Sequence, residues 1–135
     1  MKPTLAVLRE KMREKDRQSV CLLNERANIS VAIGRVKGQR GMEIYNPAQE
    51  ARVFDYLDEL NDGPLSKSQM TSIYREIIST SRDLQKPMHI AYLGPEASFS
   101  HLAARLHFGV SSRFFPQSGI GRVFDEVEKG AIDWG

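Results

Sequence analysis

Two cations on one predicted helix are spaced to hold a small anionic molecule. Arg26 and Lys37 lie eleven residues apart in a stretch without proline. Eleven steps of about 100° return to within about 20° of the start, so both side chains share one helix face, about 16 Å apart. Leaning inward, they would hold opposite ends of a molecule roughly 8 to 10 Å across. The alternative is that both are solvated helix charges, with Lys37 favouring the helix C-terminus.

A third cation, Arg9, precedes Arg26 by seventeen residues on the same predicted helix. It is therefore about 25 Å away along the axis and rotated by about 100°. On one straight helix Arg9 cannot reach the pocket of Arg26 and Lys37. It would reach that pocket from the helix of a partner chain that crosses the first.

Polar groups recur as pairs four residues apart, a spacing that places both on one helix face. Ser81 and Gln85 form one pair, and Asn46 and Glu50 form another. Such groups suit the orientation of a ligand. The alternatives are a solvated polar stripe for the first pair, and for the second a helix cap with a favourable first-turn charge.

The motifs of metal and covalent catalysis are missing from the sequence. No Cys, His or Asp cluster has metal-ligand spacing, and the three histidines, at 89, 101 and 107, all follow residue 86. Cys21 lies in an apolar-rich helical stretch, which predicts a core position and not a nucleophile. There is no nucleophile motif or phosphate-binding loop. We therefore expect no metal and no cofactor, and an enzyme that works by holding its substrate.

The first 86 residues predict three helices of very unequal length. Residues 4–37 have apolar positions at spacings of three, four and seven and a polar middle, which predicts one amphipathic helix, bent or locally exposed around Asp16. At about 50 Å it is too long for a compact domain of this size, so we expect a homodimer. After a loop at 38–46, helices are predicted at 47–61, where Asn46 is the cap and Pro47 the first residue, and at 67–84, capped by Ser66.

After Pro87 the pattern changes to that of an α/β segment. A strand is predicted at 89–93, a helix at 98–108, a second strand at 112–115 and a second helix at 120–129. About 48 residues are fewer than most independent domains have. We therefore expect an all-α domain at 1–86, followed at 87–135 by an incomplete α/β segment.

Composition narrows the class of protein. The 135 residues are 41% hydrophobic and 27% charged, as is usual for globular proteins. No apolar run approaches the ~20 residues of a membrane span, and the N-terminus has no signal-peptide core. A single cysteine fits the reducing cytoplasm. The net charge of +2 is too small and too dispersed to indicate nucleic-acid binding.

Taken in order, these residues resemble a known family, the all-helical chorismate mutases. The similar segments are Leu8–Lys11 with Asp16, Leu23–Arg26, Ile33–Lys37, Ile44–Glu50 and Ile77–Gln85. Residues 90–101, IAYLGPEASFSH, are similar to the start of prephenate dehydratase domains. Together the two parts resemble the bifunctional chorismate mutase–prephenate dehydratases of phenylalanine and tyrosine biosynthesis. The Thr-Arg-Phe motif of dehydratases is absent, so we expect no dehydratase activity from this sequence.

The resemblance implies an intertwined helical dimer that rearranges chorismate to prephenate. It implies that Arg26 and the partner chain's Arg9 bind the substrate carboxylates, with Ser81 bonded to one of them. Lys37 and Gln85 would donate to the ether oxygen. Glu50 would accept from the substrate hydroxyl, with Asn46 nearby.

The sequence departs from this family at two positions. Asn46 stands where aspartate is common, and Gln49 where arginine is often found. We expect altered affinity, since one cation is lost from a site for a dianion, and continued activity. Two alternatives stay open. One is a non-catalytic helical dimerisation or regulatory module, and the other is a part of a longer bifunctional enzyme with dehydratase activity.

Overall fold

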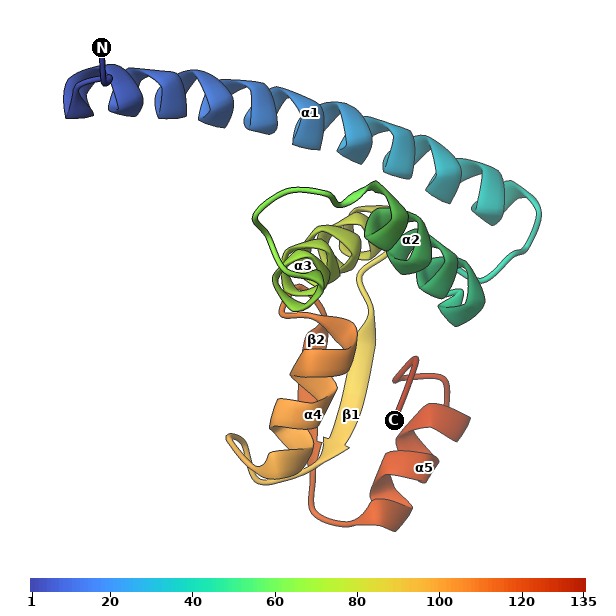
Figure 1. The fold of residues 1–135 in the computed structure, drawn as a ribbon. Helices are drawn as coiled ribbons and strands as arrows, with labels where there is room; N and C mark the ends of the chain where they lie inside the picture. The colour runs from blue at the N-terminus through green and yellow to red at the C-terminus, as the bar shows by residue number, and fades with distance from the viewer.

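The computed structural model describes residues 1–135 as a helical part followed by a small α/β part (Figure 1). The helical part contains α1 (Leu5–Gln39), α2 (Pro47–Leu60) and α3 (Lys67–Gln85). The α/β part contains β1 (His89–Leu93), α4 (Phe99–Phe108), β2 (Arg113–Gln117) and α5 (Ile120–Glu128). The predicted order of elements is confirmed throughout. No helix is both long enough and apolar enough to span a bilayer.

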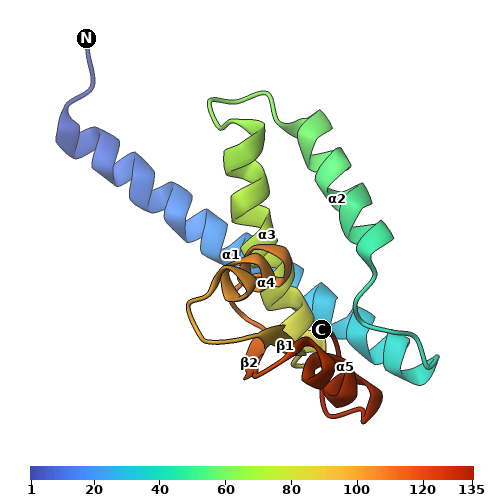
Figure 2. The same cartoon turned by 90° about the horizontal axis from the view of Figure 1, so that it is seen from below.

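Helix α1 is a single continuous helix, and only its C-terminal half packs against the rest of the chain (Figures 1 and 2). The Thr4 hydroxyl caps its start by accepting from the amide of Val7 at 3.4 Å. Every residue before Arg26 is exposed. The polar middle keeps its helical form through local pairs such as Glu14 with Arg17, at 2.7 Å. One chain therefore supplies no partner for about half of its longest helix.

Helices α2 and α3 begin at the predicted caps. The Asn46 side chain accepts from the amide of Gln49 at 3.1 Å, and Pro47 occupies the first turn of α2. At the start of α3, Ser66 and Gln69 form a reciprocal capping box, with bonds of 3.1 and 2.9 Å. These caps fix where α2 and α3 start, next to the segments that connect them to the rest of the chain.

The α/β part is built on two parallel strands joined through α4. Residue His89 of β1 is opposite Arg113 of β2, and the pairing continues to Leu93 and Gln117. The buried core lies where β1 meets the helical part. Tyr45, Met88 and Ile90 form it, with Ala104, Phe108 and Phe114 packed against them. Tyr45 comes from the loop between α1 and α2, so the two parts share this core.

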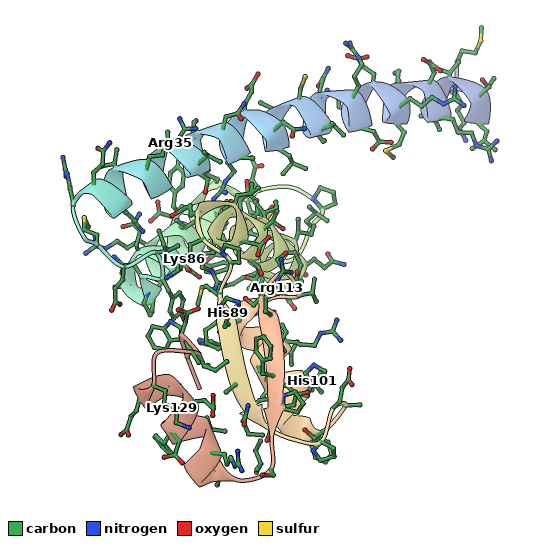
Figure 3. All side chains as sticks on the ribbon, turned by 180° about the vertical axis from the view of Figure 1, so that it is seen from behind. Arg35, Lys86, His89, His101, Arg113 and Lys129 are labelled. Atoms are coloured by element: carbon green, nitrogen blue, oxygen red, sulfur yellow. The ribbon has the colours of Figure 1, made fainter.

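Polar side chains also connect the two parts at their junction, where Figure 3 labels Lys86 and His89. Lys86, which follows α3, lies 3.9 Å from a carboxylate oxygen of Asp133, and the Nδ1 of His89 lies 3.4 Å from the other oxygen. The His89 amide donates to that same Asp133 oxygen at 2.8 Å. The C-terminal residues are thereby tied back to the point where the chain leaves α3.

Several predicted details are corrected by the structure. Cys21 is exposed and not in the core, because no other segment of the chain packs against that stretch of α1. The helix runs on to Gln39, so the loop begins two residues later than predicted. Strand β2 spans Arg113–Gln117 and not 112–115, because its register with β1 continues to Gln117. α5 ends at Glu128, since Gly130 follows with a positive φ of 77°.

Candidate active site

A cavity of about 450 Å³ lies between α1, the start of α2 and the end of α3. Its wall contains five aliphatic side chains, Ile29, Ile33, Ile44, Val53 and Ile78. Its polar lining consists of Arg26, Ser30, Lys37, Asn46, Gln49, Glu50, Ser81, Arg82 and Gln85. Three cations and one carboxylate therefore face a small space with an apolar wall, which favours an anionic organic molecule of modest size.

The structure brings six of the seven predicted site residues to this cavity and leaves out the seventh. The six are Arg26, Lys37, Asn46, Glu50, Ser81 and Gln85. Arg9 is not among the lining residues and lies on the exposed half of α1. In a single chain the cavity therefore has no contribution from Arg9.

Arg26 is held between two helices. Its Nη1 donates to the Ser81 hydroxyl of α3 at 2.8 Å. Its guanidinium also lies over the ring of Tyr74, 5.9 Å from the centroid. A guanidinium has five N–H donors in a fixed plane. With one used on Ser81, others remain to meet a carboxylate in a two-pronged geometry.

Lys37 is held over the cavity by the backbone. Its Nζ donates to the carbonyl oxygen of Ile44 at 3.0 Å, which ties the last turn of α1 to the loop before α2. An ammonium carries three donors, so this contact orients the group while leaving N–H bonds for a ligand. The predicted shared face of Arg26 and Lys37 is thus found, with both cations lining one cavity.

The Asn46 side chain has a structural task as well as a place in the lining. Its amide oxygen accepts the Gln49 amide as the cap of α2, which takes one of the two lone pairs of that oxygen. The resemblance implies that this side chain lies near the substrate hydroxyl. Its NH₂ group has no protein partner, so the side chain is better placed to donate to a ligand than to accept from one.

Glu50 is the one carboxylate in the cavity, and Arg82 accompanies it. The Nε of Arg82 lies 3.2 Å from Oε2 of Glu50, an ion pair without hydrogen-bond alignment, since this Nε makes no hydrogen bond. Burial raises the pKa of Glu50, and the nearby charges of Arg82 and then Lys37 act in the opposite direction. Its protonation state therefore depends on the cations around it.

Gln85 reaches the cavity through a chain of hydrogen bonds that starts on α1. Its Nε2 donates to the Ser30 hydroxyl at 2.8 Å, and that hydroxyl donates to the carbonyl oxygen of Ser81 at 3.1 Å. Its Oε1 is buried without a hydrogen-bond partner. Close approach requires Gly34, because a Cβ there would lie 2.8 Å from Cγ of Gln85. The fold therefore fixes this amide with one N–H free.

Sequence reasoning missed Ser30 and Arg82 as members of the lining. Ser30 had a signal, since it lies four residues after Arg26 and seven before Lys37, on the same face of α1. Arg82 had a weaker one. It is adjacent to Ser81 and three residues before Gln85, but an arginine in a helix is usually solvated, and here it is 4% exposed.

Comparison with known proteins finds two families along the chain. The family described as "Chorismate mutase type II" matches residues 8–86, and the family described as "Prephenate dehydratase" matches residues 90–135. Proteins named "Bifunctional chorismate mutase/prephenate dehydratase" are 38% identical in Stutzerimonas stutzeri, over 97% of this chain, and 38% identical in Aquifex aeolicus, also over 97%. The protein of that name in Escherichia coli K12 is 29% identical over 96%. The chain spans 37% of the length of the first two relatives and 38% of the third.

Proposed function

Because the chain belongs to the chorismate mutase type II family, we propose that its helical part converts chorismate to prephenate in the cavity between α1, α2 and α3. The observation that carries this proposal is the convergence of Arg26, Lys37, Glu50 and Gln85 on one small cavity. This set supplies charge and hydrogen bonds on several sides of a ligand, which is what a reaction controlled by substrate shape needs. The unit proposed to do this is residues 1–86. Residues 87–135 would be the first part of a dehydratase-like domain.

The proposed reaction is a rearrangement within one molecule. One C–O bond breaks as one C–C bond forms, and no proton is transferred to or from the protein. The cavity would hold the dianion in the compact form in which the two carbons meet, and such orientation lowers the barrier by removing entropy in advance. Donors aimed at the ether oxygen would stabilise the charge that develops there as the C–O bond breaks.

The contacts in the structure suggest a role for each group. Arg26, fixed by Ser81, would bind one carboxylate of the substrate. Lys37 and Gln85, each already held by one hydrogen bond, would turn their remaining N–H groups to the ether oxygen. Glu50 would accept from the substrate hydroxyl through the oxygen that does not face Arg82. Preorganised donors need no rearrangement when the substrate binds, which is the source of their catalytic value.

The working unit that we propose is a homodimer in which Arg9 of each chain completes the cavity of the other. The exposed half of α1 supports this, because it carries apolar side chains that its own chain does not cover. Leu5, Leu8, Met12, Val20, Leu22 and Leu23 are all exposed. A second copy of α1 crossing the first would bury them and would bring a fourth cation to the dianion. The mass of the particle, measured by light scattering, tests this assembly.

Incubation of the purified chain with chorismate tests the function directly. Chorismate should disappear, and acid treatment of an aliquot, which converts prephenate to phenylpyruvate, should identify the product. Phenylpyruvate formed without acid would instead show dehydratase activity. Lys37→Ala should abolish turnover while the circular dichroism spectrum is unchanged. The control is Lys129→Ala, at an exposed position after α5, which should leave turnover unchanged. Turnover unchanged in Lys37→Ala would overturn the role given to this lysine.

The cytoplasm is the compartment that we propose for this reaction. Cys21 is a free, exposed thiol and the only cysteine, which suits a reducing environment.

A further inference from the structure

The α/β part docks on α3 through four consecutive residues. The Phe108 carbonyl accepts from Nη2 of Arg82 at 3.0 Å, and the Val110 amide donates to Oε2 of Glu76 at 3.1 Å. The Ser111 hydroxyl lies 3.2 Å from that of Thr80. Between them Gly109, with a φ of 78°, sits so close to Ser79 that a Cβ would lie 2.3 Å from the serine Cβ. The end of α4 is thus fitted to one face of α3.

Arg82 is the residue of this interface that also reaches the cavity. Its Nη2 donates to the Phe108 carbonyl, one of those left without a helical partner at the C-terminus of α4, where a positive charge is favourable. Its Nε lies 3.2 Å from Glu50 in the cavity wall. The guanidinium is further confined by the rings of Tyr45 and Phe108, with centroids at 5.0 and 5.9 Å. One buried group therefore touches both parts of the chain.

We propose that Arg82 is a positioning residue, which holds the Glu50 carboxylate in the cavity while the end of α4 holds Arg82. The α/β part would then act on the reaction of the helical part through the Phe108 carbonyl, Arg82 and Glu50. This inference rests on the proposed function, because Glu50 matters for catalysis only if the cavity is the active site. It adds that seating of α4 on α3 is required for full activity.

The charges around Glu50 support this role for Arg82. Lys37 and Arg26 face the cavity from α1, Arg82 from α3, and Tyr45 lies in the loop before α2. The His107 Nε2 of α4 lies 2.9 Å behind the Tyr45 hydroxyl. Burial raises the pKa of Glu50, and among the cations Arg82 opposes this rise most, ahead of Lys37. Without Arg82 the carboxylate would take up a proton at higher pH.

Four full-length variants, compared with the unchanged chain, test the inference. Arg82→Met removes the charge, and Arg82→Lys keeps the charge but lacks the planar fork that serves two acceptors at once. Gly109→Ala pushes the end of α4 away from Ser79 without altering the cavity lining. Gly121→Ala, in α5, is the matched control, because a Cβ there meets nothing within 4 Å. Steady-state rates are measured across pH, and the Glu50 carboxyl is titrated by ¹³C NMR, assigned with Glu50→Gln.

Arg82→Met should raise the pKa of Glu50 and move the acidic limb of kcat/KM to higher pH, with a roughly ten- to hundredfold loss at neutral pH. Arg82→Lys should restore the position of the limb but not the full rate. Gly109→Ala should lower kcat/KM in the same direction as Arg82→Met, and Gly121→Ala should not. If Arg82→Met and the unchanged chain have the same pH profile and the same pKa of Glu50, the inference is overturned, even if Arg82→Met is less stable.

Different experimental outcomes would contradict the inference and the proposed function. A chain that does not consume chorismate at all would end the proposed function, and the NMR titration would still report whether Arg82 controls Glu50. A chain that is active, and whose Gly109→Ala variant keeps its full rate, would keep the proposed function and remove the coupling to α4.

Discussion

Ser30 of α1 and Gln85 of α3 are joined by a 2.8 Å hydrogen bond, although 55 residues separate them in the sequence. The same serine hydroxyl donates to the carbonyl of Ser81, so a single buried side chain fixes the distance between the two helices that form the cavity. The relationship is possible only because Gly34, one turn further along α1, has no side chain to hold the helices apart. The site is therefore sensitive to changes that leave its lining residues intact.

Gly34→Ala should reduce activity through this contact. The new Cβ would lie 2.8 and 2.9 Å from Cγ and Cβ of Gln85 and 3.2 Å from its Cα, so the end of α3 must shift. A displacement of about 1 Å at a positioned group can cost roughly a hundredfold in rate. Steady-state kinetics should show this loss. The control is Gly38→Ala on the same helix, which meets nothing within 4 Å and should stabilise the helix by about 0.5–1 kcal/mol.

Gln49→Arg should tighten substrate binding. Residue 49 lines the cavity in the first turn of α2, and an arginine there would add a further cation to a site proposed to bind a dianion. We expect KM for chorismate to fall severalfold at low ionic strength with little change in kcat, because the added charge acts on substrate and transition state alike. The gain should shrink as salt is added. A KM that does not change at any salt concentration would show that the cavity does not bind the dianion here.

Variants of Asn46 should show how much its side chain contributes to stability as the cap of α2. Asn46→Asp keeps the acceptor for the Gln49 amide and adds a negative charge at the N-terminus of α2, so stability should rise by about 0.3–1 kcal/mol. Asn46→Ala removes the cap and should cost about 1 kcal/mol. Urea unfolding measures both changes. Equal stability of the two variants would contradict the cap observed at 3.1 Å.

The free energy of unfolding should depend on pH in the way that the raised pKa of Glu50 requires. Its pKa is raised above the ordinary value of 4.5, mainly by burial, so between the unfolded and folded pKa values the folded state holds more protons. The contribution of Glu50 to stability is therefore full below the unfolded pKa and is lost as pH rises through the folded pKa. Unfolding free energies of the unchanged chain and of Glu50→Gln, measured from pH 4 upward, should differ in this direction. A difference that grows in favour of the unchanged chain with rising pH would contradict it.

Mixing two inactive variants should restore activity if Arg9 acts across the proposed dimer. Arg9→Ala and Lys37→Ala would each lack one group in every cavity. After unfolding and refolding together, half of the dimers would be mixed, and each mixed dimer would have one intact cavity, giving about a quarter of the original activity. Recovery of nothing, with mixed dimers present by mass spectrometry, would place Arg9 in the cavity of its own chain or outside the site.

The features predictable from sequence were those that depend on local spacing. Asn46 and Ser66 determine where helices start through bonds to residues three positions away, and Pro47 suits the first turn of α2. The alignment of Arg26 with Lys37 follows from helix geometry alone. Arg82 could not be found in this way. Its burial depends on Tyr45, from the loop between α1 and α2, and on Phe108, from α4, both of which are distant from it in the sequence.

Cys21 shows the opposite error, because it was predicted to be buried and is exposed. An apolar-rich stretch predicted a core position, but burial requires a neighbour, and the sequence of one chain does not show whether that neighbour is supplied by the same chain. The strand boundary at Gln117 has the same origin, since it is set by pairing with Leu93 and not by the residues of β2 themselves.

The unsupported half of α1 has a consequence for how the protein responds to dilution. Most helical stability in proteins comes from the packing of an apolar face and not from helix propensity. In a single chain every residue of α1 before Arg26 is exposed. In the proposed dimer, formation of this helix and association of the chains are one equilibrium, so protomer concentration sets both. Far-ultraviolet circular dichroism should therefore show helix content falling on dilution, together with the catalytic rate per chain.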